Sequence, residues 1–180
     1  MEIVGLVLAG GKSSRMGQDK AELRFGDQNL LDHAIETLSD SLCQRVLVSR
    51  NKGNAIKDRF IGLGPLAGID AAVVGLNNGI WLSVLPVDMP LVNSAHLIAL
   101  QHYSLKQQQA CYFEGFMLPC VLQINNALRV YLANSLSKQK SLSLRALLKA
   151  LNAKPLASIR PDLLINTNTP EQWRSLETTL

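Results

Sequence analysis

The sequence has little of several features that would assign it to large classes of protein. Only 18% of its 180 residues are charged and only 5% are aromatic, whereas 47% are hydrophobic. A chain this apolar and this weakly charged is not expected to be disordered. Its three cysteines are an odd number without C-x-x-C spacing, which predicts neither a disulfide framework nor a cysteine-rich zinc site. A reducing cytoplasm is therefore the expected location.

The sequence also lacks a long hydrophobic run. The longest, from Ile3 to Gly11, is far shorter than the ~20 residues that span a bilayer. Glu2 precedes this run where a signal peptide has basic residues, so we expect neither a signal peptide nor membrane binding. No linker or internal repeat divides the chain, and its length suits one domain. We therefore expect residues 1–180 to form a single domain.

Acidic residues are missing from one long segment. Residues 1–90 carry a net charge of −1 and residues 91–180 a net charge of +5. No acidic residue lies between Glu114 and Asp162. Two interpretations of this segment stay open: it forms solvated helix faces, or it forms a surface that binds an anionic ligand. Nucleic-acid binding is not expected, because Phe116 and Tyr131 are the only aromatic residues of the segment and no nucleic-acid motif appears. The segment contains seven cations: Arg129, Lys138, Lys140, Arg145, Lys149, Lys154 and Arg160.

Short apolar runs alternate with stretches of helical period, which predicts β-α units around a mainly parallel sheet. We expect strands near residues 3–8, 46–49, 81–85, 109–113, 119–124 and 155–159. Helical spacing of apolar residues marks helices near 31–42, 66–76, 97–105, 127–136 and 143–151. The predicted fold class is α/β, with a sheet between layers of helices.

A glycine-rich stretch, residues 8–20, follows the first predicted strand directly. Paired glycines, Gly10 and Gly11, let backbone N–H groups approach phosphate oxygens closely. Ser13 adds a hydroxyl donor, while Arg15 and Lys20 add positive charge. A Walker loop is excluded, because its first glycine would fall on Leu6, and the adjacent glycines do not fit G-x-G-x-x-G. The stretch is therefore expected to hold a polyphosphate.

A single carboxylate follows the third predicted strand. Asp88 lies between Pro86 and Pro90, at the strand end where open α/β sheets bind ligands. Mg²⁺ binds through one or two carboxylates and completes its shell with phosphate and water, so Asp88 is a candidate metal ligand. The alternative is an ordinary turn or helix-capping aspartate.

Residues 8–20 match the nucleotidyltransferase signature L-A-x-G-x-S-x-R-M-G-x-D-K at every fixed position. Four further segments follow in the order found in the molybdenum cofactor guanylyltransferases: G-P-L-A-G at 64–68, P-V-D-M-P at 86–90, L-P at 118–119 and N-T-N-T-P-E at 166–171. The chain thus resembles that family over nearly its whole length. The resemblance implies a single-domain, Rossmann-like three-layer α/β/α fold of the nucleotide-diphospho-sugar transferase type.

The resemblance also implies an activity and a site. GMP would pass from GTP to the terminal phosphate of molybdopterin or Mo-molybdopterin, with release of pyrophosphate and with Mg²⁺ as cofactor. Asn51 and Asp58 resemble family residues near the nucleotide, although Asn51 also reads as an ordinary loop asparagine. The implied catalytic residues are Arg15, Lys20 and Asp88. The implied metal ligands are Asp88 and Asn168, although Asn168 could instead belong to the start of a helix. The implied nucleotide-binding residues are Leu8, Ala9, Gly10, Gly11, Ser13, Lys20, Asn51, Asp58, Gly64, Pro65 and Asp88.

The two halves of the chain are expected to divide the substrates. Residues 1–100 would bind the nucleotide and residues 101–180 the acceptor. Other molybdenum cofactor biosynthesis proteins and molybdoenzymes are expected partners. Two alternatives stay open: a nucleotidyltransferase for another phosphorylated acceptor, by cytidylyl transfer to molybdopterin or transfer to a sugar 1-phosphate, and a non-catalytic nucleotide-binding partner of molybdoenzymes.

Overall fold

A computed structural model describes residues 1–10, 19–167 and 172–173. Its centre is a six-stranded sheet with the order β4-β1-β5-β7-β6-β8. Strand β7 runs antiparallel to both of its neighbours, and the other pairings are parallel. The strands are β1 (Ile3–Leu8), β4 (Arg45–Ser49), β5 (Trp81–Pro86), β6 (Cys111–Phe113), β7 (Cys120–Gln123) and β8 (Lys154–Leu156).

The central strands are apolar because both of their faces are covered. In β1, Val4 and Leu6 pack into one hydrophobic core, whereas Ile3 and Val7 pack into another on the opposite face. Trp81 of the neighbouring strand β5 is fully buried, as expected of a core residue. Continuous apolar runs are the pattern of strands that are buried on both faces.

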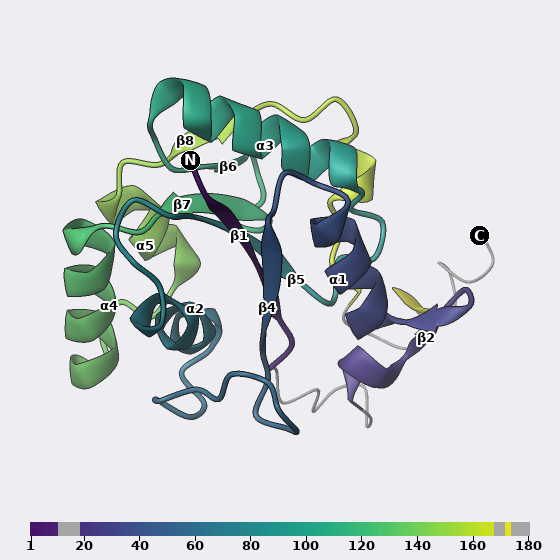
Figure 1. The fold of residues 1–180 in the computed structure, drawn as a ribbon, viewed down its shortest axis with the longest axis horizontal. Helices are drawn as coiled ribbons and strands as arrows, with labels where there is room; N and C mark the ends of the chain where they lie inside the picture. Colours follow the sequence, from purple (N-terminus) through teal and green to yellow (C-terminus); the bar gives the residue numbers. More distant parts are fainter. Residues whose placement is uncertain (11–18, 168–171, 174–180) are drawn as a thin grey trace.

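Helices cover each face of the sheet. Figure 1 shows the sheet running between α1 and α3 on one side and α2, α4 and α5 on the other. Proline at the first position of α2 suits a helix start. The three-layer α/β/α fold expected from the sequence is thus confirmed. The helices are α1 (Leu30–Ser39), α2 (Pro65–Val74), α3 (Ser94–Gln107), α4 (Asn126–Lys138) and α5 (Leu144–Ala150).

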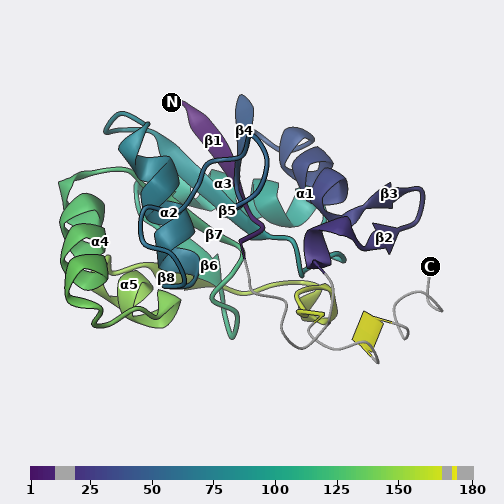
Figure 2. The same ribbon diagram turned by 90° about the horizontal axis from the view of Figure 1, so that it is seen from below.

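Three small elements and several boundaries differ from the prediction; α1, for example, ends at Ser39 and not near residue 42. A hairpin of β2 (Arg24–Phe25) and β3 (Gln28–Asn29) lies beyond α1 (Figure 2). Two short 3₁₀ turns, η1 (Lys20–Glu22) and η2 (Pro161–Leu163), were also not expected. The last strand ends at Leu156 and does not reach residue 159. Within the described parts of the chain, no helix is long and apolar enough to cross a membrane.

Candidate functional site

A cavity of about 1030 Å³ opens at the carboxyl ends of β1, β4 and β5. Three parallel strands end there together, because β1 pairs in register with β4 on one side and with β5 on the other. Helix termini and loops that follow such strand ends are the usual ligand site of open α/β sheets. From these strand ends and the residues after them, the cavity lining includes Leu8, Ala9, Gly10, Ser49, Pro86, Val87 and Asp88.

Lys20 and Asp88 meet in this cavity. Lys20 Nζ lies 3.2 Å from Asp88 Oδ2, and the two side chains are only 16% and 21% exposed. Asp88 follows β5 directly, and its backbone carbonyl accepts a hydrogen bond of 2.7 Å from the N–H of Thr167. A half-buried ammonium beside a carboxylate brings a phosphate-binding charge and a candidate metal ligand to one place.

A second carboxylate lines the cavity near Gly10. Ser49 Oγ donates to Asp58 Oδ1 at 3.2 Å, and Asn51 Nδ2 donates to Asp58 Oδ2 at 2.9 Å. The backbone N–H of Asp58 in turn donates to Asn51 Oδ1 at 2.9 Å. Asp58 is therefore held from both sides. Asn51 does not line the cavity itself, whereas Ser49 does.

Two glycines bring α2 against the cavity. Gly64 caps the helix with a φ of +72°, a conformation that side chains other than glycine rarely adopt. Gly68 faces the sheet so closely that an added Cβ would lie 2.7 Å from Ser49 Oγ and 2.8 Å from Leu8 Cδ2. The G-P-L-A-G segment thus forms a cavity wall, which includes Pro65 as well as both glycines.

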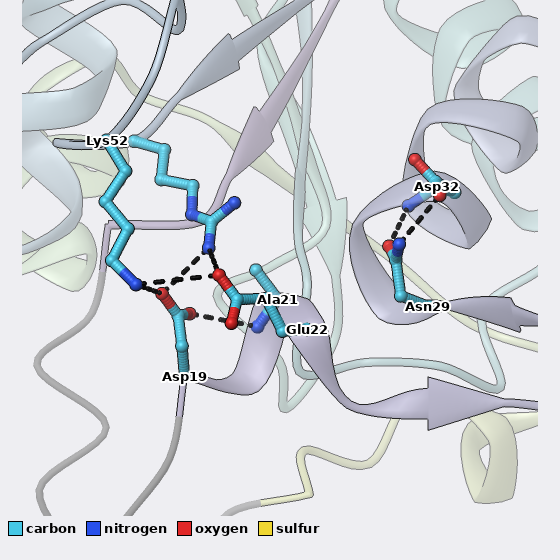
Figure 3. Close-up of polar contacts among 7 residues, drawn as sticks. Asp19, Ala21, Glu22, Asn29, Asp32 and Lys52 are labelled. Atoms are coloured by element: carbon cyan, nitrogen blue, oxygen red, sulfur yellow. Dashed lines mark hydrogen bonds and ion pairs between the residues drawn. The ribbon is translucent and has the colours of Figure 1, made fainter.

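Asp19, immediately before Lys20, belongs to an ionic network at the edge of the cavity (Figure 3). Arg50 Nη2 lies 2.8 Å from Asp19 and 2.6 Å from Glu22, and Lys52 Nζ lies 2.9 Å from Asp19. Burial raises the pKa of Asp19, but hydrogen bonds from Arg50 and Lys52 outweigh it, so the net pKa is lowered. The hydrogen bond to Asp19 raises the pKa of Arg50. Both shifts favour the charged forms of Asp19 and Arg50.

Another part of the cavity wall comes from the second half of the chain and is largely apolar. It comprises Gly115, Phe116, Met117, Leu118, Leu144, Leu164, Ile165, Asn166 and Gln172. None of the seven cations of the acid-free segment is among the described lining residues. Arg129 binds the backbone carbonyls of Val73 and Leu76 at the end of α2, and Lys138 and Lys140 border a separate hollow of about 430 Å³.

Most residues singled out from the sequence lie around one cavity. The lining includes Leu8, Ala9, Gly10, Lys20, Asp58, Gly64, Pro65 and Asp88. Gly11, Ser13, Arg15 and Asn168 lie outside the described residues. The sequence reasoning assigned no role to Ser49, Phe116 or Met117, and it marked Asp19 and Leu118 only as motif positions. Ser49 is the last residue of a predicted strand, which is the signal that could have found it.

A metal ion would have few protein ligands here. No group of three or more His, Cys, Asp or Glu side chains suited to a metal occurs among residues 1–10, 19–167 and 172–173. The partly exposed Asp88 carboxylate is nevertheless a hard oxygen donor at the cavity wall. It fits Mg²⁺, which retains water and takes further oxygens from a bound phosphate chain.

Comparison with solved structures identifies the fold. The computed structure superposes on the molybdopterin-guanine dinucleotide biosynthesis protein A of Archaeoglobus fulgidus with a TM-score of 0.77, 20% identity and coverage of 98% and 97% of the two chains. It superposes on the 2-C-methyl-D-erythritol 4-phosphate cytidylyltransferase of Thermus thermophilus with a TM-score of 0.73, 17% identity and coverage of 99% and 98%. At these identities the likeness shows the fold, which is that of nucleotidyltransferases.

Sequence comparison identifies the family. Residues 5–156 match the family described as the MobA-like NTP transferase domain. A protein of Xanthomonas euvesicatoria pv. vesicatoria, called molybdenum cofactor guanylyltransferase, is 38% identical over 178 residues, which cover 96% of this chain and 93% of that protein. The chain therefore belongs to the MobA-like nucleotidyltransferase family, as its motifs predict.

Proposed function

We propose that this protein transfers GMP from GTP to the terminal phosphate of molybdopterin or Mo-molybdopterin. An oxygen of that phosphate attacks the α-phosphorus of GTP; a new P–O bond forms there, and the bond to the β-phosphate oxygen breaks to release pyrophosphate. The observation that carries the proposal is the Lys20–Asp88 pair in a cavity at three strand ends, in a chain 38% identical to a guanylyltransferase along nearly all of its length.

Lys20 is the proposed contact of the phosphate chain. Such a reaction requires little covalent chemistry from the protein, so positioning and charge stabilisation carry it. The Lys20 ammonium would neutralise charge that builds on the α-phosphoryl oxygens and on the leaving pyrophosphate. Arg15, in the same signature, is proposed for the same task on the grounds of its sequence position.

Asp88 is the proposed ligand of Mg²⁺, with Asn168 as a second candidate from the sequence. When bound, Mg²⁺ supplies positive charge beside the phosphate oxygens. Lys20 and the metal would then share the site, and the Asp88 carboxylate could contact both. The 21% exposure of the Asp88 side chain leaves it accessible from the cavity.

Asp58 is the proposed acceptor for the guanine edge. Guanine presents two adjacent donors, N1–H and N2–H₂, which match the two oxygens of a carboxylate, whereas cytosine has one amino group beside an acceptor. Ser49 and Asn51 hold the Asp58 carboxylate at the cavity near Gly10, where no side chain intervenes. Backbone groups of Leu8, Ala9 and Gly10 and the Gly64–Gly68 segment would complete the nucleotide site, and Asn51 would act through Asp58.

The apolar wall at Phe116, Met117 and Leu118 is the proposed place of the pterin, opposite the nucleotide half. This arrangement supports the division into a nucleotide part, residues 1–100, and an acceptor part, residues 101–180. Other molybdenum cofactor biosynthesis proteins are proposed to supply the pterin, and molybdoenzymes to receive the product. The cytoplasmic location expected from the sequence stays a prediction.

A nucleotide-binding titration tests the proposal. GTP, CTP, ATP and UTP are each titrated calorimetrically into the protein with Mg²⁺, and GTP is expected to bind most tightly. Asp58→Asn should reduce the preference for GTP over CTP by about tenfold, because an amide presents a donor to one of the guanine donors. Tighter binding of CTP than of GTP by the unaltered protein would overturn the guanylyl assignment.

A further inference from the structure

Arg50 lies outside the lining of the cavity, yet its side chain is only 15% exposed and bridges two acids. It follows β4, where its backbone N–H donates to the carbonyl of Ile56 at 3.0 Å, so the sheet edge fixes its position. From there the guanidinium reaches Asp19, which is distant in sequence and immediately precedes Lys20. The contact therefore joins the end of a central strand to the start of η1.

Asp19 connects Arg50 to the turn η1 that follows it. One of its carboxylate oxygens contacts Arg50, while the other accepts a hydrogen bond of 3.2 Å from the N–H of Ala21. The carbonyl of Asp19 also accepts from the N–H of Glu22 at 3.0 Å. Asp19 is thus the N-cap of η1, the three-residue turn on which Lys20 is the first residue. A turn this short has almost no stability of its own and depends on such contacts.

The pair differs from an ordinary surface ion pair. Exposed pairs contribute little, because water and salt screen them. Lys52 and Glu22, at the outer side of the network, are 59% and 63% exposed, whereas Arg50 and Asp19 are 15% and 22% exposed. We therefore expect loss of the Arg50–Asp19 contact, and not of the Lys52–Glu22 contact, to displace the backbone at Asp19.

We propose that Arg50 is a positioning residue that holds Asp19 at the end of β4 and thereby directs Lys20 toward Asp88. The inference rests on the proposed function, in which Lys20 contacts the phosphates. It adds a residue that touches no substrate but determines how well the phosphate chain is bound. Arg50 should consequently affect phosphate binding and leave base binding unchanged.

Arg50→Gln tests the inference. The affinities of the variant and of the unaltered protein for pyrophosphate and for guanosine are compared by calorimetry and by competition against GTP. A displaced Lys20 should weaken pyrophosphate and GTP binding about tenfold or more, because errors of about 1 Å in position are costly at such sites. Guanosine, which has no phosphate, should bind as it does to the unaltered protein. Arg45→Gln is the matched control, since Arg45 begins the same strand in an exposed pair with Glu2, and it should change neither affinity.

A double variant tests whether Arg50 acts through Asp19. If it does, Arg50→Gln combined with Asp19→Asn should bind pyrophosphate no more weakly than Asp19→Asn alone. Additive losses would overturn the inference, as would unchanged pyrophosphate binding in Arg50→Gln or equal losses for pyrophosphate and guanosine. Should Arg50→Gln fail to fold, Arg50→Lys, which keeps the charge without the forked geometry, is judged by the same pyrophosphate and guanosine criteria.

Failure of the proposed function can be told apart from failure of the positioning role of Arg50. If the unaltered protein prefers CTP, the guanylyl assignment fails, but the Arg50 comparison continues with pyrophosphate and with cytidine in place of guanosine. A phosphate-specific loss in Arg50→Gln then still supports the positioning role, and its absence still overturns it.

Discussion

At the scale of residues, the site depends on three charged side chains. Lys20, Asp58 and Asp88 come from three separate segments, and each lines the same cavity. The places of Lys20 and Asp88 after predicted strands could be read from the sequence, whereas Asp58 came from the family resemblance alone. The contacts that hold this part of the site could not be read from it: Ser49 meets Asp58 because the chain after β4 folds back beside Ser49, and Arg50 meets Asp19 only in the folded chain.

Asp88→Asn tests the role of the carboxylate. Asparagine preserves the shape but removes the charge, so it loses the ion pair with Lys20 and most of the affinity for a divalent cation. Turnover, measured as pyrophosphate release, should fall by about 10²-fold or more. The melting temperature should change little, because a partly exposed ion pair contributes at most about 1 kcal/mol. Asp162→Asn, which removes an exposed pair with Arg160, is the control and should leave turnover unchanged. Normal turnover in Asp88→Asn would exclude the proposed role.

At the scale of elements, the sequence predicts the buried strands and the amphipathic helices well, because their apolar patterns are long. Strand β7 shows why direction is harder to predict: Cys120–Gln123 is as apolar as the parallel strands, and nothing in the residues marks it as antiparallel. The β2–β3 hairpin has strands of two residues, too short for any periodicity. The Gly26-Asp27 pair between them is the available signal, a dipeptide typical of two-residue hairpin turns.

Gly68→Ala tests the close approach of α2 to the sheet. The added Cβ would push Ser49 Oγ and Leu8 Cδ2 away from their positions and so disturb Asp58. GTP affinity should fall about tenfold. The cost to stability is offset in part, because alanine favours a helix over glycine by up to about 1 kcal/mol.

Gly75→Ala is the matched control at the other end of the same helix. The nearest atom to an added Cβ there is 3.9 Å away, an ordinary contact, so both affinity and melting temperature should be nearly unchanged. Equal GTP affinity in the Gly68→Ala and unaltered proteins would contradict the proposed link from α2 through Ser49 to Asp58.

At the scale of the whole molecule, the net charge of +4 is unevenly distributed along the chain, and most of the excess lies in the second half. None of the seven cations of the acid-free segment is among the described residues that line the cavity, and Arg129 instead binds carbonyls at the end of α2. The total charge therefore could not have located the site, whereas the motifs could, because described residues of every motif segment line one cavity.

Global stability should depend on pH through His96. This side chain forms a capping box with Asn93 at the start of α3 and packs edge-on against Phe113, and burial lowers its pKa. Arg160 and Asp162 also face it with opposing effects. Because the unfolded chain takes up the proton first, stability should be lost as the pH falls below about 6.5, the ordinary pKa of histidine.

Thermal melts between pH 7.5 and 5.5 measure this dependence. The melting temperature of the unaltered protein should fall on acidification, and His96→Gln, which can still form the capping box, should flatten the slope. His102→Gln, an exposed position on the same helix, should leave the slope as it was. An unaltered slope in His96→Gln would assign the pH dependence to other groups.

The most direct test of the central claim is transfer of labelled nucleotide. The protein is incubated with Mg²⁺, molybdopterin and either GTP or CTP carrying the label on the α-phosphate. We predict that label passes from GTP to the pterin with one pyrophosphate released per transfer, and that CTP gives little product. Faster transfer from CTP, or pyrophosphate release that does not depend on molybdopterin, would contradict the account.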